Sequence, residues 1–120
     1  MTERAFSILP HLPFSILLPS PTLLRSPLPL LSAAAAAGQR DFGENFVQEG
    51  LDKVQALAEF SLTWHFIGHL QSNKTRDVAE YFDWVHTIDK LKTARRLSQQ
   101  RPEGRAPLNI CLQVNIDDEE

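Results

Sequence analysis

The sequence predicts an α/β protein with a parallel sheet, and three observations support this. From residue 38 onward, short apolar runs rich in β-branched and aromatic residues alternate with amphipathic segments of helical length. Polar residues gather directly after the apolar runs, where the carboxyl ends of parallel strands meet helix N-termini. Strands that alternate with helices pair in parallel through right-handed crossovers. The predicted four strands and three helices fit a small open sheet or part of an eight-stranded barrel.

Residues 1–36 differ in composition from the rest and are expected to form a disordered leader. Leu, Pro, Ser and Ala dominate it, and prolines recur from Pro10 to Pro29 too closely for a helix or a central strand. A targeting peptide is the less favoured interpretation because these prolines interrupt the apolar stretch. An unstructured or mistranslated leader is favoured. The sequence has no uninterrupted span of about 20 apolar residues, so a membrane-spanning helix is not expected. The folded domain is expected over residues 37–120.

The first predicted helix runs from Asn45 to Phe60, after a strand that ends near Glu44. Val47 and Leu51 begin an apolar face that continues at helical spacing. Asn45 is a plausible N-cap, and a Gln three residues later completes a capping-box pattern.

A second strand and helix are expected over the next twenty residues. Thr63 to Ile67 is a β-prone run closed by Gly68, and a helix from Ser72 to Phe82 follows. Ser72 would cap this helix.

Trp84 to Ile88 is the third predicted strand, Asp89 to Gln99 the next helix, and Leu108 to Ile116 the fourth strand. The last strand is followed by acidic residues and no further helix, which favours part of a barrel over a complete open sheet. Its Cys111 cannot form an internal disulfide, so a reducing compartment and a buried structural thiol are expected.

Composition bounds the function. The 120 residues carry a net charge of −3 with a pI near 5.8, which suits one small soluble domain and argues against nucleic-acid binding. The basic residues near the last helix are interpreted as its solvent-exposed face; they are Lys90, Lys92, Arg95 and Arg96.

Two polar residues near the strand ends are candidate ligand contacts. Asn45 can hydrogen-bond a ligand or cap its helix, and capping is the favoured role on sequence alone. His65 lies between two aromatic residues, so strand alternation turns it to the opposite face from both. A hydrogen-bonded core histidine is the commoner case. His65 and His69 have zinc-ligand spacing, but Gly68 between them predicts a turn and disfavours a metal site.

The segment Gln71 to Lys74 opens the second predicted helix. Free backbone N–H groups and the helix dipole at such a position favour an anion such as phosphate. Ser72 and Lys74 are therefore candidate anion contacts, although Lys74 can equally be a solvated surface charge.

Several segments in one register resemble successive motifs of the pyridoxal phosphate homeostasis protein family. They are AGQRDFGEN at 37–45, WHFIG at 64–68, LQSNK at 70–74 and HTID at 86–89. The resemblance covers residues 37–120. It implies a single-domain (β/α)8 barrel related to the N-terminal domain of alanine racemase. It further implies a monomeric, cytoplasmic protein that binds pyridoxal 5'-phosphate (PLP), maintains vitamin B6 and amino-acid balance, and catalyses no established reaction. No membrane or nucleic-acid partner is implied.

The same resemblance assigns cofactor contacts to Asn45 and His65, with Ser72 and Lys74 as further candidates. Family members carry their Schiff-base lysine upstream of the AGQ motif, whereas no lysine precedes Lys53 here. The chain also stops before the half that supplies phosphate contacts in the family, so residues 37–120 correspond to the second to fifth barrel strands. Two alternatives follow: an inactive truncated member that lacks this lysine, and a racemase-like PLP enzyme.

Overall fold

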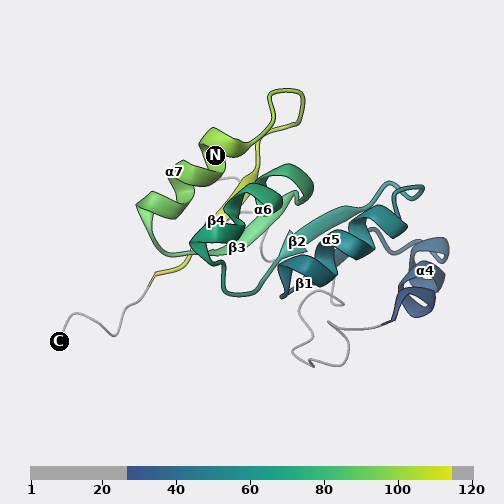
Figure 1. Ribbon diagram of the computed structural model, residues 1–120. Helices are drawn as coiled ribbons and strands as arrows, with labels where there is room; N and C mark the ends of the chain where they lie inside the picture. The colour runs from purple at the N-terminus through teal and green to yellow at the C-terminus, as the bar shows by residue number, and fades with distance from the viewer. Residues whose placement is uncertain (1–26, 115–120) are drawn as a thin grey trace.

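The computed structural model describes residues 27–114, which form a four-stranded parallel sheet with helices packed against it (Figure 1). Its strands are β1 Asp41–Glu44, β2 Thr63–Phe66, β3 Trp84–Ile88 and β4 Asn109–Leu112. Its helices are α4 Leu28–Ala36, α5 Val47–Ala56, α6 Thr75–Tyr81 and α7 Leu91–Gln100, with a short 3-10 helix, η2, at Ser72–Lys74. The predicted α/β class is therefore confirmed.

The strand order distinguishes the two architectures that the sequence leaves open. The order is β1-β2-β3-β4, so each strand pairs with the next one along the chain. Helices α5, α6 and α7 all lie on one face of the sheet (Figure 1). A doubly wound sheet reverses its strand order and carries helices on both faces. Sequential order with helices on one face is the arrangement of a (β/α)8 barrel segment.

The core lies between the sheet and these helices. Phe42 of β1 packs against Trp64 of β2 with ring centroids 5.5 Å apart. Phe66 meets Phe82 edge to face at 5.6 Å. Leu97 brings α7 into the same apolar cluster. Alternate residues of β1 and β2 therefore face the helices, and the residues between them face the other side.

A buried ion pair fixes α5 on β1. The Lys53 ammonium donates to both carboxylate oxygens of Glu44, at 3.2 and 3.1 Å. Both side chains are almost fully buried. Gly50, one turn before Lys53, lets α5 approach closely, because a Cβ there would lie 2.6 Å from Phe82 Cζ.

The expected disorder of the leader is wrong for its last residues, which form α4. Pro27 is the N-cap of α4 and Pro29 lies in its first turn. Proline is tolerated there because first-turn N–H groups have no acceptor within the helix. The alanine run then continues the helix, and Leu31 and Ala35 are buried against the core. The expectation for residues 1–26 falls outside the described part of the chain.

Several predicted helix starts are also corrected. Helix α5 begins after Phe46, its N-cap, and no side chain caps it, so the Asn45 capping box is wrong. Ser72 opens the 3-10 helix η2 and caps neither η2 nor α6. Helix α7 begins after Lys90 instead of at Asp89. None of the described helices is long and apolar enough to cross a membrane.

Candidate functional site

The first two strands end at a cavity of about 500 Å³, called the rim cavity below. One wall is formed by residues 45–48, which are the two residues that join β1 to α5 and the first two residues of α5. Residues of the loop after β2 form another, and Lys74 lies at the end of η2. The cavity is thus at the carboxyl edge of the sheet, where parallel α/β proteins bind ligands.

Asn45 contributes an unsatisfied hydrogen-bond acceptor to this cavity. Its Oδ1 atom is buried and has no hydrogen-bond partner in the described structure. The correction to the start of α5 explains this, because an asparagine that capped the helix would use that oxygen. Buried polar atoms without a partner are rare and costly in folded proteins. Because Oδ1 is buried, a hydrogen-bond donor in the cavity reaches it only when the Asn45 side chain turns toward the cavity.

Lys74 contributes a cation to the same cavity. The side chain is half-buried, and its ammonium makes no hydrogen bond or ion pair with any residue described in the structure. The neighbouring walls include the apolar side chains of Phe46, Val47 and Phe66. A planar apolar ring fits such walls, and the amine can interact with an anion or a carbonyl group of the same ligand.

The first turn of α5 also lines the cavity. Val47 and Gln48 are the first residues of α5, and no side chain caps their end of the helix. The Gln48 side chain instead donates to Asp52 Oδ1 at 3.4 Å. The positive end of the helix dipole favours a negatively charged group beside Val47 and Gln48 at this end of the cavity.

Gly68 holds the two cavity loops together. A Cβ on Gly68 would overlap the backbone of Asn45, so only glycine permits this approach. The hydroxyl of Thr87, on β3, donates a hydrogen bond to the Gly68 carbonyl at 2.6 Å and so fixes this loop to the neighbouring strand. The loop that carries Asn45 is thereby fixed to the loop after β2.

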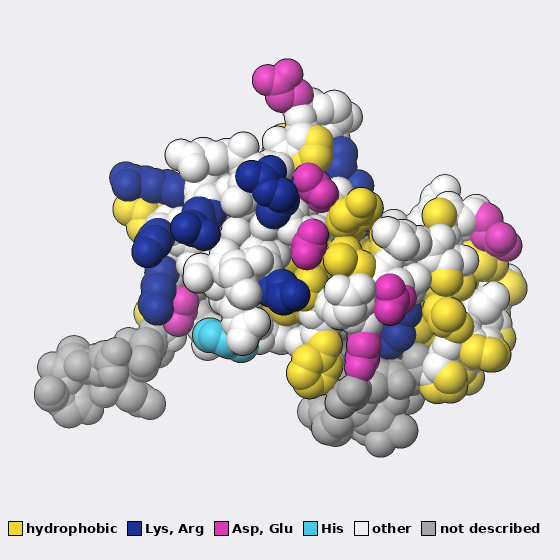
Figure 2. All heavy atoms as spheres, in the orientation of Figure 1, with side chains coloured by type: hydrophobic (Ala, Val, Ile, Leu, Met, Phe, Trp, Pro, Cys, Tyr) yellow, Lys and Arg dark blue, Asp and Glu magenta, His cyan; other side chains and the backbone are white. Residues whose placement is uncertain are grey.

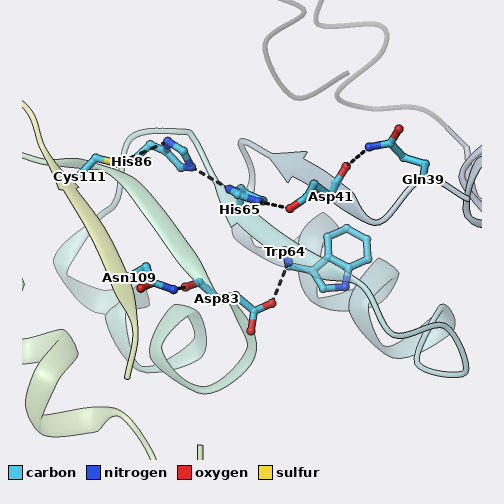
Figure 3. A network of polar contacts seen from close by, with 8 residues as sticks. All are labelled: Gln39, Asp41, Trp64, His65, Asp83, His86, Asn109 and Cys111. Carbon is cyan, nitrogen blue, oxygen red and sulfur yellow. Dashed lines mark hydrogen bonds and ion pairs between the residues drawn. The ribbon is translucent and has the colours of Figure 1, made fainter. Parts of the chain in front are cut away.

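A second polar arrangement crosses the sheet on the face away from the helices (Figure 3). It consists of one residue from each strand, Asp41, His65, His86 and Cys111, called the sheet network below. His65 Nε2 lies 3.0 Å from Asp41 Oδ1, and His65 Nδ1 lies 2.9 Å from His86 Nε2. Cys111 Sγ lies 3.8 Å from His86 Nδ1.

The carboxylate fixes the direction of every hydrogen bond in this network. Ionised Asp41 only accepts, so His65 Nε2 carries a proton and its Nδ1 accepts from His86 Nε2–H. His86 Nδ1 is then left to accept from the Cys111 thiol. Burial lowers the pKa of His65, and burial together with His65 lowers that of His86 to about 4. Burial also raises the pKa of the Cys111 thiol. Both imidazoles are therefore neutral near pH 7.

The four predicted site residues fall into three places. Asn45 and Lys74 line the rim cavity together. His65 is fully buried in the sheet network and does not line that cavity. Ser72 is exposed and lines a separate cavity beside α7, where its carbonyl accepts from Arg96 Nη1 at 3.1 Å. Basic side chains gather over α7 on the face shown in Figure 2, as the predicted solvent-exposed face requires.

Sequence reasoning missed Gly68, His86 and Asp41 as parts of these sites. Strand alternation could have placed His86 on the same face as His65. Each histidine is next to a buried aromatic or apolar residue, and neighbouring residues of a strand point to opposite faces. The zinc spacing of His65 and His69 does not bring the two side chains together, because His69 lines the rim cavity. Within residues 27–114 no group of three or more His, Cys, Asp or Glu side chains is placed to hold a metal ion.

Comparison with known proteins identifies the family. Residues 28–119 match the model of the alanine racemase N-terminal domain. The chain belongs to this family. The match begins within the expected leader, at the first residue of α4.

Close relatives within this family confirm the resemblance that the motifs indicate. The pyridoxal phosphate homeostasis protein of Pseudomonas aeruginosa is 59% identical over 93 residues, which is 78% of this chain and 40% of that protein. That of Escherichia coli is 56% identical over 96 residues, with 78% and 41% covered. The chain therefore spans about two-fifths of the length of these curated relatives.

Solved structures agree with the fold. PipY of Synechococcus elongatus, solved without PLP, superposes with a TM-score of 0.69 at 40% identity. The same protein with PLP bound gives 0.68 at 40% identity. Each comparison covers 96% of this chain and 54% of PipY. The family member thus shares the α/β arrangement described above.

Proposed function

We propose that this chain binds PLP in the rim cavity and acts in vitamin B6 and amino-acid homeostasis without catalysing a reaction. The observation that carries the proposal is that the rim cavity is lined by both Asn45 and Lys74. Within residues 27–114, Asn45 Oδ1 has no hydrogen-bond partner and the Lys74 ammonium has no partner. The names of the relatives and the PLP-bound PipY structure support the choice of ligand. A cytoplasmic location, with no nucleic-acid or membrane partner, belongs to the same proposal.

The residues present fit the chemical groups of PLP. Asn45 Oδ1 would accept a hydrogen bond from the ring hydroxyl, and Phe46, Val47 and Phe66 would contact the ring. The first turn of α5 and the Lys74 ammonium favour the phosphate. When bound, PLP supplies an aldehyde that reacts with amines, so a protein that encloses it limits its reactions with other amines in the cell. His65 lies in the sheet network outside the rim cavity, so it would not contact PLP bound there.

Equilibrium dialysis of the complete chain against PLP tests the proposal. Asn45→Ala removes the acceptor, and Asn73→Ala removes an exposed asparagine outside the cavity as a matched control. A lost hydrogen bond of about 1.4 kcal/mol predicts roughly tenfold weaker binding for Asn45→Ala. Asn73→Ala should bind like the wild type. Equal binding by all three proteins, or no saturable binding by the wild type, would contradict the proposal.

A further inference from the structure

We propose that two copies of this chain close one eight-stranded barrel, in which β4 of each copy pairs in parallel with β1 of the other. The described residues supply four consecutive strands, which is half of the strands of a (β/α)8 barrel. Four such strands turn through about half of a circle, so a twofold axis along the barrel places the second copy on the open side. This assembly does not require PLP.

The outer edge of β4 presents backbone groups that no described strand uses. The Gln113 N–H donates to the Ile88 carbonyl at 2.6 Å, and the Asn109 N–H also donates to the β3 side. Backbone groups of neighbouring residues in a strand point to opposite sides, so those of Ile110 and Leu112 point away from β3. Within residues 27–114, β4 pairs only with β3. This edge is therefore available to a further parallel strand.

The outer edge of β1 is complementary to it. The carbonyls of Arg40 and Glu44 accept hydrogen bonds from the β2 side, at 2.7 and 2.9 Å. By the same alternation, the backbone groups of Asp41 and Gly43 point away from β2. The Asp41 carbonyl accepts from the Gln39 side chain at 2.9 Å instead of from a strand. In the described part of the chain β1 pairs only with β2, so its outer edge suits a parallel neighbour such as β4.

The rest of this sequence is too short to supply four more strands. Parallel strands need a crossover of about a dozen residues or more between them. Only residues 1–26 and 115–120 lie outside the described part. The first of these stretches is also interrupted by prolines, which disfavour paired strands; they are Pro10, Pro13, Pro19 and Pro21. A second copy of the chain supplies four strands and both matching edges at once.

The superposition on PipY supports closure with two copies. The chain covers 54% of PipY with a TM-score of 0.69, so the unmatched part of PipY is nearly as long as the matched part. A contact between two different edges either closes into a ring or continues as a filament. Because four strands occupy half of the barrel, the contact between β4 and β1 closes after it has been made twice.

Closure also brings a partner strand to each of the two sites described above. The sheet network of one copy ends at Asp41 on β1 and at Cys111 on β4, so each network would end beside that of the other copy. Parallel strands have their carboxyl ends at the same edge of a sheet. The exposed Leu112 and Val114 of one copy would therefore lie beside the rim cavity of the other and give it a further apolar wall.

Sedimentation equilibrium of the complete chain without PLP tests the proposal, together with proline variants of each edge. Gly43→Pro removes an outward N–H from β1, and Leu112→Pro removes one from β4. Proline is tolerated on a strand edge whose N–H faces outward, so each variant keeps its pairing with β2 or β3. The double variant, which has both edges blocked, is the matched control. Circular dichroism establishes that each variant is folded.

We expect the wild type to reach twice the 13.6 kDa mass of one chain and to show no further rise over a tenfold higher range of concentration. Each single variant alone should be monomeric, because the blocked edge takes part in both contacts. An equimolar mixture of Gly43→Pro and Leu112→Pro should regain a dimer through one intact contact, at least tenfold weaker than that of the wild type. Either single variant mixed with the double variant should stay monomeric.

The wild-type mass tests the proposal even if a proline variant does not fold. A monomeric wild type, or a mass that grows beyond two copies without a plateau, would overturn the closed dimer. A dimer of Gly43→Pro alone would overturn the pairing of β4 with β1, because it would show that β4 pairs with β4. A mixture of the two folded single variants that stays monomeric would overturn it as well.

Discussion

The sheet network shows how a buried histidine is held in one tautomer. Both ring nitrogens of His65 are used, one by Asp41 and the other by His86, and the side chain is fully buried. The sequence predicts that His65 faces away from its aromatic neighbours, and the structure confirms this. Its partners could not be predicted, because Asp41 and His86 lie on other strands and meet it only once the strand register is set.

The network predicts a pH dependence of stability that depends on His86. The folded pKa of His86 is about 4, below its usual 6.5, so the unfolded chain binds more protons between these values. This contribution is present above pH 6.5 and is lost as the pH falls toward 4. His86→Leu should cost about 1–3 kcal/mol at pH 7, because His65 Nδ1 loses its donor.

Urea unfolding at pH 7 and pH 5 measures this effect. The difference between wild type and His86→Leu isolates the histidine from other groups that titrate in the same range. The variant should lose less stability than the wild type between the two pH values. An identical loss in both proteins would contradict the assigned role of His86.

The pair of Glu44 and Lys53 predicts the opposite pH trend. Burial raises the pKa of Glu44 to about 7, against the opposing effect of Lys53. Its folded pKa lies above its usual 4.5, so its contribution is full below pH 4.5 and is lost as the pH rises toward 7. Lys53→Met should therefore cost most at pH 8, by about 3 kcal/mol, and less at pH 5, where Glu44 binds a proton.

The double variant Glu44→Gln, Lys53→Met is the control for this prediction. It carries no buried charge at the site. Its free energy of unfolding should therefore exceed that of Lys53→Met at pH 8, and the two values should be similar at pH 5. Chemical denaturation at the two pH values measures both variants. A cost of Lys53→Met that does not change with pH would show that Glu44 does not become charged there.

At the scale of elements, periodicity located the strands and helices better than their ends. The strand Trp84–Ile88 has the predicted bounds, because its apolar run ends in clear polar neighbours. The start of α5 was wrong because Asn45 faces the rim cavity instead of capping the helix. Helix α4 was missed because proline in a first turn carries no penalty, which a count of prolines does not reveal.

Helix α5 gives a direct test of close packing. Alanine has a higher helix propensity than glycine by about 1 kcal/mol, so Gly50→Ala would stabilise an isolated helix. In the folded chain its Cβ would meet the ring of Phe82, which is fully buried and cannot move freely. We expect a net loss of about 1–2 kcal/mol in unfolding free energy. Gly104→Ala, which meets nothing within 4 Å, should change stability by less than about 0.5 kcal/mol.

At the scale of the whole molecule, the strand order distinguishes a barrel segment from an open doubly wound sheet, which the periodicity of the sequence could not do. Alternating strands and helices predict a parallel sheet, but a barrel segment and an open sheet have the same pattern along the chain. The rim cavity likewise depends on two loops that meet only because Gly68 touches the backbone of Asn45. The sequence therefore predicted Asn45 and Lys74 as candidates but not that they share one cavity.

The outer strand β4 predicts self-association of the chain. In the described part of the chain, β1 and β4 are the outer strands, and Leu112 and Val114 are 42% and 73% exposed beside β4. Exposed apolar edges pair with other chains. The average mass measured by sedimentation should rise with concentration, and Leu112→Lys should reduce this rise. Leu91→Lys, on an exposed leucine of α7, should not. A chain that stays monomeric and unfolds in one cooperative thermal transition would contradict this prediction.

The most direct test of PLP binding in the rim cavity is an amide NMR titration of the ¹⁵N-labelled chain with PLP. We expect saturable shifts centred on Asn45, Val47, Gly68 and Lys74 in the wild type. In Asn45→Ala the shifts of the other three residues should need roughly tenfold more PLP to reach half-saturation. Shifts confined to other parts of the chain, or no saturable shifts at all, would contradict the central claim.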